Sequence, residues 1–200
     1  MFILLYSALG SNSSERVEWV LTYKGLEWDR IEVTNEALKT TYREQINPFG
    51  FVPALVHGGR TLVESMAIIE YLDECFPDKP VLGVSPSARA QIRSVCSHVG
   101  STIHSPQNRT VLNFLRPELS ETDKKDLRAR WIGDQLETLE PMLWRDGHFC
   151  CGTSFSAADV FVATIYRKYL QHGGGKLDRF DGHRTHLAEQ GLIPDYLRQN

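Results

Sequence analysis

The alternation of apolar and polar positions in the first part of the chain predicts four short strands. "FILLY" at 2–6 opens the chain, and "WDRIEV" at 28–33 reads as a second, partly exposed strand. "VPALV" at 52–56 and "TLV" at 61–63 are separated by "HGGR", the pattern of a β-hairpin.

Helical patterns lie between and after these strands. Val17, Val20 and Leu21 form an apolar stripe after the first strand, and residues 36–45 predict a polar helix. A third helix ends at Pro77, which cannot continue it. The predicted order is βαβαββα, and the fold class is α/β for this part of the chain.

Beyond Pro80 the pattern changes. The linker "KPVLGVSPS" carries two prolines, and only helical patterns follow it. We therefore predict two domains, an α/β domain at 1–80 and an all-helical domain at 86–200. Two apolar stripes predict long amphipathic helices in the second domain: Ile92, Val95, Cys96, Val99 and Ile103, and Ile132, Leu136, Leu139 and Leu143.

Composition excludes several classes of protein. A net charge of −3 argues against a nucleic-acid partner, because such proteins usually show a basic excess. The four cysteines have no framework spacing, which favours a reducing compartment. No apolar run is long enough for a membrane span, so we expect a cytoplasmic protein that binds small molecules or proteins.

Small polar residues crowd the junction between the first strand and the first helix. The run "GSNSS" occupies 10–14, and Asn12 followed by Glu15 fits a helix N-cap with an acidic residue three positions on. Capping leaves surplus hydroxyls unexplained. Hydroxyls and free N–H groups at a helix N-terminus suit a thiolate, and since no cysteine lies nearby, the thiol would arrive with a ligand.

Two further segments carry candidate binding residues. Pro53 starts a strand, where it is either a plain edge proline or a cis proline; a cis bond would expose the backbone of Val52 to an extended peptide-like ligand. Glu64 and Ser65 precede the third helix, whose N-terminus can hold an anion. From that segment alone, ordinary capping is the favoured interpretation.

Other motifs are assigned to structure. Ser156 and Asp159 form a capping-box pattern, in which either replacement should cost about 1 kcal/mol of helix stability. "HGGGK" at 172–176 lacks the spacing of a phosphate loop and reads as a turn. The histidines and cysteines show no ligand spacing, so no metal site is predicted.

Together these segments resemble the glutathione transferase family over nearly the whole chain. "SNSSERV", "KGLEWDRIEV", "ESMAIIEYLDE" and "IHSPQNRTVL" are most similar to its zeta class, which includes maleylacetoacetate and maleylpyruvate isomerases. The resemblance implies a thioredoxin-like N-terminal domain that binds glutathione, an all-helical second domain, and a homodimer. In the isomerases, the glutathione sulfur adds to a conjugated cis double bond, allows rotation, and leaves again.

The resemblance also implies roles for particular residues. Ser11 matches the serine that supports the glutathione thiolate, and it is the expected catalytic residue. The remaining residues of the tripeptide site would be Ser13, Val52 with a cis-Pro53, Glu64 and Ser65. His104, Asn108 and Arg167 are the residues expected to contact substrate, although His104 also fits a histidine satisfied inside the helical domain.

The chain departs from the zeta pattern at several positions. Asn12 and Ser13 replace a serine and a cysteine, and Gly10 and Gln171 replace arginines that would hold substrate carboxylates. Arg167, one turn before Gln171, is the candidate to replace one of them.

The sequence therefore supports two candidate functions. One is a glutathione-dependent transferase or isomerase acting on a small electrophile, such as an unsaturated acid. The other is a non-catalytic ligand-binding or interaction module. A redox thioltransferase would need a cysteine at the first helix, and there is none.

Overall fold

The computed structural model describes residues 2–198 and divides the chain into two compact units. The first unit ends at Val81 and the second begins at Leu82. No helix among the described residues has both the length and the apolar character needed to cross a bilayer.

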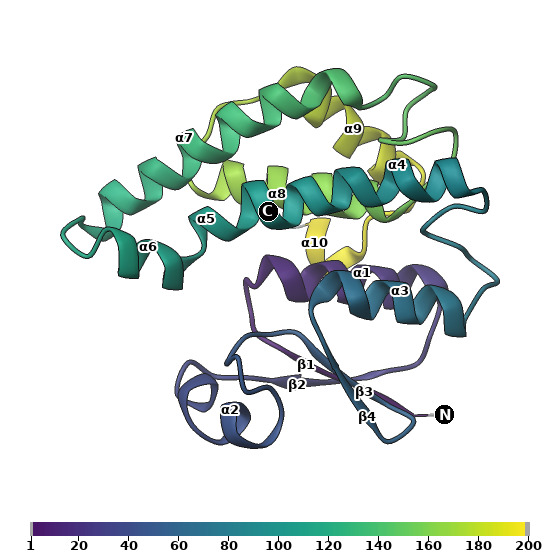
Figure 1. Cartoon of the computed structure of the whole chain (residues 1–200). Coiled ribbons are helices and arrows are strands. Elements are labelled where there is room, and N and C mark those ends of the chain that lie inside the picture. The colour runs from purple at the N-terminus through teal and green to yellow at the C-terminus, as the bar shows by residue number, and fades with distance from the viewer. Residues whose placement is uncertain (1, 199–200) are drawn as a thin grey trace. The chain divides into compact units, whose positions relative to one another are not determined.

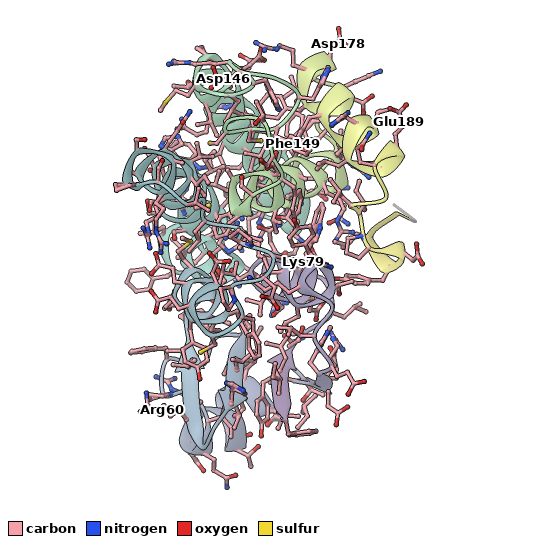
Figure 2. All side chains as sticks on the ribbon, turned by 90° about the vertical axis from the view of Figure 1, so that its right-hand side faces the viewer. Arg60, Lys79, Asp146, Phe149, Asp178 and Glu189 are labelled. Carbon is pink, nitrogen blue, oxygen red and sulfur yellow. The ribbon has the colours of Figure 1, made fainter. Side chains whose placement is uncertain are left out.

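The first unit contains a four-stranded sheet in the order β2-β1-β3-β4. The strands are β1 (Ile3–Ser7), β2 (Asp29–Glu32), β3 (Ala54–His57) and β4 (Arg60–Val63). β1 pairs in parallel with β2 and antiparallel with β3, and β3 and β4 form the expected hairpin. Gly58 and Gly59 both have positive φ, as this tight turn requires, and the side chain of Arg60 follows it (Figure 2).

Two helices, α1 (Asn12–Lys24) and α3 (Ser65–Cys75), pack side by side over one face of this sheet (Figure 1). The stripe at Val17, Val20 and Leu21 is fully buried, as its helical spacing predicts. The observed order confirms the predicted βαβαββα arrangement.

A buried ion pair joins the two helices. The Lys24 ammonium donates to Asp73 Oδ1 at 2.8 Å and to the carbonyls of Phe76 and Lys79 at 2.9 and 2.8 Å. Three acceptors match the three hydrogens of the ammonium group, so burial leaves no donor of this side chain unsatisfied. The end of α1 is thereby fixed to the end of α3.

The polar helix predicted at 36–45 is broken into two pieces. A 3₁₀ turn, η1 (Ala37–Lys39), precedes α2 (Thr41–Gln45), and Thr40 between them has φ −126° and ψ −112°. The Thr40 hydroxyl donates to the Glu36 carbonyl at 3.0 Å, which competes with helical backbone pairing.

Phe49 and Phe51 lie in the loop that follows α2 and are 61% and 45% exposed.

The second unit is helical. Its helices are α4 (Pro86–Ser97), α5 (Ser105–Gln107), α6 (Arg109–Leu115), α7 (Glu121–Leu139), α8 (Ala157–Gln171), α9 (Asp178–Glu189) and α10 (Asp195–Arg198), with a 3₁₀ turn η3 (Glu140–Met142) after α7. α8 is the central helix, because it contacts α4, α7 and α9, and every residue of its first three turns is buried (Figure 1).

The apolar stripe from Ile92 to Ile103 does not form one regular helix. α4 passes at His98 into a π-helical segment, η2 (His98–His104), which leads into α5. Pro106 explains the wider turn, since its ring clashes with the carbonyl four residues earlier and it has no N–H to donate.

Candidate active site

Ser11 lies at the N-terminus of α1 and is its N-cap, one residue before the Asn12 that the sequence favoured. Its Oγ accepts from the Ser14 N–H at 3.3 Å, and its own N–H donates to the Ala8 carbonyl at 3.0 Å. A hydroxyl that accepts through one lone pair still has its O–H to donate. Ser11 is half-buried, so a ligand can reach this donor.

Asn12 and Ser14 add buried polar atoms at the same helix end. Asn12 Oδ1 accepts from Arg16 Nη2 at 2.6 Å. Asn12 Nδ2 and Ser14 Oγ are buried and have no hydrogen-bond partner among the described residues. Unsatisfied buried polar groups are costly and rare, and two of them lie together at this helix end. Ser13, beside them in α1, is half-buried.

The Val52–Pro53 peptide bond is cis, which settles one alternative left open by the sequence. β3 begins directly after it, between β1 and β4, so Pro53 precedes an inner strand rather than an edge strand. The Phe51 carbonyl accepts from the Tyr42 hydroxyl at 2.8 Å and from Asn47 Nδ2 at 2.7 Å. These two donors fix the backbone that enters Val52.

Glu64 has an unusual backbone conformation for a residue with a side chain, with φ 69° and ψ 116°. It is the N-cap of α3, yet its side chain makes no capping hydrogen bond. The capping interpretation favoured by the sequence is therefore wrong for Glu64. Ser65, the first residue of α3, is buried. Strained residues of this kind are found most often at functional sites.

Replacing Glu64 with glycine should raise the free energy of unfolding by about 1 kcal/mol, because glycine adopts positive φ without a steric cost. Urea unfolding measures this change. Glu36→Gly is the matched control, since Glu36 has φ −72°; there the glycine should be destabilising. Equal loss of stability in both variants would show that Glu64 is not strained.

The other three candidates belong to the helical unit. His104 ends η2, and its Nδ1 lies 3.2 Å from Gln107 Nε2. Asn108 is the N-cap of α6, where its Oδ1 accepts from the Thr110 N–H at 2.9 Å. Arg167 lies on α8, which packs against η2, and is 8% exposed. Gln171 Oε1 accepts from Lys168 at 3.4 Å.

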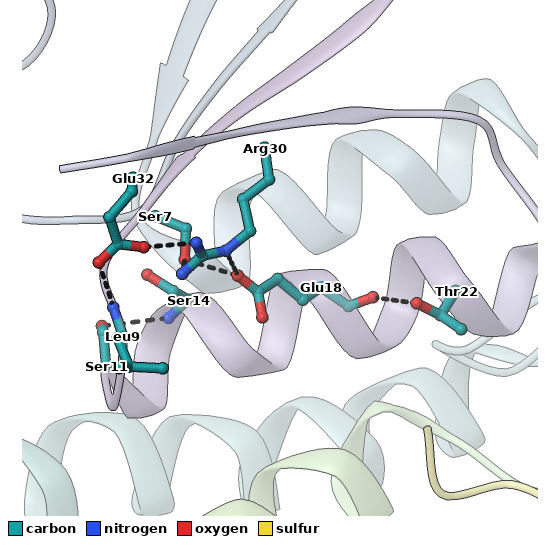
Figure 3. A network of polar contacts seen from close by, with 8 residues as sticks. All are labelled: Ser7, Leu9, Ser11, Ser14, Glu18, Thr22, Arg30 and Glu32. Atoms are coloured by element: carbon teal, nitrogen blue, oxygen red, sulfur yellow. Dashed lines mark hydrogen bonds and ion pairs between the residues drawn. The ribbon is translucent and has the colours of Figure 1, made fainter. Parts of the chain in front are cut away.

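Three charged residues that the sequence analysis did not single out, Glu18, Arg30 and Glu32, form a network near Ser11. Arg30 Nε donates to Glu18 Oε1 at 2.8 Å, and the same guanidinium pairs with Glu32 (Figure 3). A hydrogen bond from the Leu9 N–H, and then the Arg30 guanidinium, hold the pKa of Glu32 below its usual value. For Arg30 and Glu32 the signal in the sequence was the run of charges in the strand "DRIE"; Glu18 had none.

Cys150, Asp159 and His183 also gather, with one ligand-type atom each within 4.8 Å of the others, and sequence spacing did not predict this cluster. Both Asp159 oxygens already accept protein hydrogen bonds: Oδ1 from the Cys150 N–H and His183, and Oδ2 from Ser156. The cluster is therefore a hydrogen-bonded core network.

Comparison with known proteins agrees with this architecture. Residues 5–80 match the N-terminal domain of glutathione S-transferases. The maleylacetoacetate isomerase of Pseudomonas aeruginosa is 36% identical over 165 residues, which cover 79% of this chain and 77% of that protein.

Solved structures are similar over almost the full length. The holo structure of a bacterial zeta-class maleylpyruvate isomerase has a TM-score of 0.86 at 27% identity, covering 98% of this chain and 95% of its own. The maleylacetoacetate isomerase of Anaeromyxobacter dehalogenans with bound glutathione has a TM-score of 0.77 at 29% identity, with 97% of both chains covered. Another structure of that protein holds dicarboxyethyl glutathione and citrate.

A thioredoxin-like unit followed by a helical unit is the fold of the glutathione S-transferases, as expected from the sequence. The chain belongs to the glutathione S-transferase family of enzymes, and to its zeta class.

Proposed function

We propose that this chain binds glutathione and activates its thiol for attack on a small electrophile, as a zeta-type transferase or isomerase. The observation that carries the proposal is the Ser11 hydroxyl, which caps α1 through its oxygen and keeps its O–H for a sulfur ligand. Donors and the helix dipole at this position both favour a thiolate over a thiol.

The residues of the first unit fit the rest of the tripeptide. The backbone of Val52 is proposed to pair with the cysteinyl part of glutathione, in the manner of an added β-strand. The first turn of α3, with the Ser65 hydroxyl, suits the γ-glutamyl carboxylate. The Glu64 carboxylate suits the neighbouring ammonium group, and Ser13 is the further contact proposed at α1. Bound glutathione would supply the nucleophilic sulfur.

An unsaturated acid is the first substrate class to test. His104, Asn108 and Arg167 are proposed to contact it, and Arg167 is the residue suited to a carboxylate, because its planar fork binds both oxygens. This part of the proposal rests on the family, in which relatives act on maleyl compounds by name.

The second candidate is a ligand-binding module without chemistry. Specific observations favour it: Asn12 occupies a serine position of the zeta motif and already pairs with Arg16, and Gln171 occupies an arginine position and pairs with Lys168. Turnover of maleyl acids separates the candidates, because a module binds glutathione and leaves the double bond unchanged.

Calorimetric titration with glutathione tests the binding step. We expect a free energy of about −8 to −4 kcal/mol, the micromolar to millimolar range. Ser65→Ala should weaken binding about tenfold, since a hydrogen bond to a charged group is lost. The control is Ser101→Ala, whose exposed hydroxyl donates to the Ser97 carbonyl four residues earlier. Absence of binding by the folded wild type would refute the proposal.

A further inference from the structure

The loop that presents Ser11 is held from outside by a carboxylate. Ser7 ends β1, and Ser11 begins the cap of α1, so only three residues connect them. In this loop the Leu9 N–H donates to Glu32 Oε1 at 2.8 Å (Figure 3). Glu32 therefore contacts the backbone two residues before the proposed catalytic hydroxyl.

The second oxygen of Glu32 is also engaged. Arg30 pairs with Glu32 Oε2 through Nη1, and its Nε donates to Glu18 Oε1 at 2.8 Å. The Ser7 hydroxyl donates to the same Glu18 oxygen at 2.6 Å. The guanidinium thus joins β2 to α1 at the strand end where the Ser11 loop starts, and its planar geometry fixes both carboxylates.

We propose that Glu32, held by Arg30, is a positioning residue for Ser11; this inference rests on the function proposed above. Glu32 acts through the Leu9 N–H, two residues before Ser11. Its hydrogen bond fixes the loop so that the Ser11 oxygen accepts from Ser14 and the O–H is presented to the glutathione sulfur. Small displacements of a positioned group lower the rate steeply.

Removing Glu32 has two possible effects on the glutathione thiol pKa, and they have opposite signs. One comes from the lost negative charge and the other from the lost hydrogen bond to Leu9, so the inference can be tested. By charge alone, removing a carboxylate near the thiolate favours the thiolate, so glutathione thiol pKa should fall and activity should rise. By position, losing the acceptor of the Leu9 N–H displaces the Ser11 donor, so the thiol pKa should rise. The alanine and glutamine variants separate the two, because glutamine keeps one acceptor oxygen for the Leu9 N–H while it removes the charge and the second oxygen, which pairs with Arg30.

The experiment compares Glu32→Ala, Glu32→Gln and the wild type as full chains, with the exposed Glu27→Ala as matched control. In Glu32→Ala we expect kcat/KM for glutathione to fall about tenfold, as for a lost hydrogen bond to a charged group. The pH profile of kcat/KM should shift to higher pH. Glu32→Gln should stay within about threefold of the wild type, because a neutral hydrogen bond remains, and Glu27→Ala should be unchanged.

Amide hydrogen exchange at Leu9, measured on the free protein, provides a readout that does not need glutathione. It should be about tenfold faster in Glu32→Ala than in Glu32→Gln or Glu27→Ala. Unchanged exchange in Glu32→Ala, or an equal loss of kcat/KM in the alanine and glutamine variants, would overturn the inference. A wild type that fails to bind glutathione would refute the proposed function, and Leu9 exchange would still decide whether Glu32 holds the loop.

Discussion

Replacement of Asp159 with alanine should lower the free energy of unfolding by about 4 kcal/mol, well beyond an ordinary helix cap. Asp159 is fully buried, and its oxygens accept from the backbone of Ser156 at 2.8 Å, the Ser156 hydroxyl at 2.9 Å, the Cys150 N–H at 2.7 Å and His183 at 2.9 Å. Alanine leaves these donors buried and unpaired.

The chain contains its own control for this prediction. Ser120 and Asp123 form the same S-x-x-D pattern at the start of α7, and there both residues are exposed. Asp123→Ala should cost about 1 kcal/mol, because water can replace the lost acceptor. Chemical denaturation of both variants gives the comparison. Equal losses would mean that burial adds nothing to the Asp159 network.

Replacement of Ser11 with alanine should reduce kcat/KM on the order of 100-fold at neutral pH, the loss typical of a donor that stabilises a developing anion. Without the Ser11 hydroxyl the thiolate of glutathione is less stable, so the thiol pKa rises. The loss of kcat/KM should therefore be largest at pH values below the thiol pKa of the wild-type complex. It should shrink as the pH rises through the higher thiol pKa of the variant.

A capping control is needed here as well, because Ser11 also accepts from the Ser14 N–H. Ser120 caps α7 in the same way, with its Oγ accepting from the Asp123 N–H at 3.1 Å. Ser120→Ala and Ser11→Ala should each lose about 1 kcal/mol of stability, but only Ser11→Ala should lose activity. A pH profile in Ser11→Ala that is lower than the wild type by the same factor at every pH would contradict the thiolate role.

The sequence predicted those structural features that are determined by residues close together in the chain. The buried stripe of α1 and the Ser156–Asp159 box are set by residues three or four positions apart, and both were predicted. The hairpin followed from two glycines. The predicted N-cap of α1, Asn12, was one residue too late, because the observed cap is Ser11. Serine and asparagine are both good caps, and the preceding loop decides between them.

The contacts that the sequence did not predict depend on strand register and helix packing. Glu32 reaches Leu9 only because β1 and β2 pair in parallel with Ser7 opposite Glu32. His183 reaches Asp159 across 24 positions, through the contact of α8 with α9. The positive φ of Glu64 has no local signal either, because the residue type does not favour it.

The charged residues of β2 lie at an edge of the sheet, where they oppose pairing with another chain. All four residues of this strand are exposed, and it is one of the two edges of the sheet. An open strand edge invites backbone pairing with another chain, and charged side chains oppose this pairing. Asp29, Arg30 and Glu32 supply three charges in four residues. The carboxylate and guanidinium that hold the Ser11 loop thus also protect the sheet edge against self-association, so selection for either role would preserve the other.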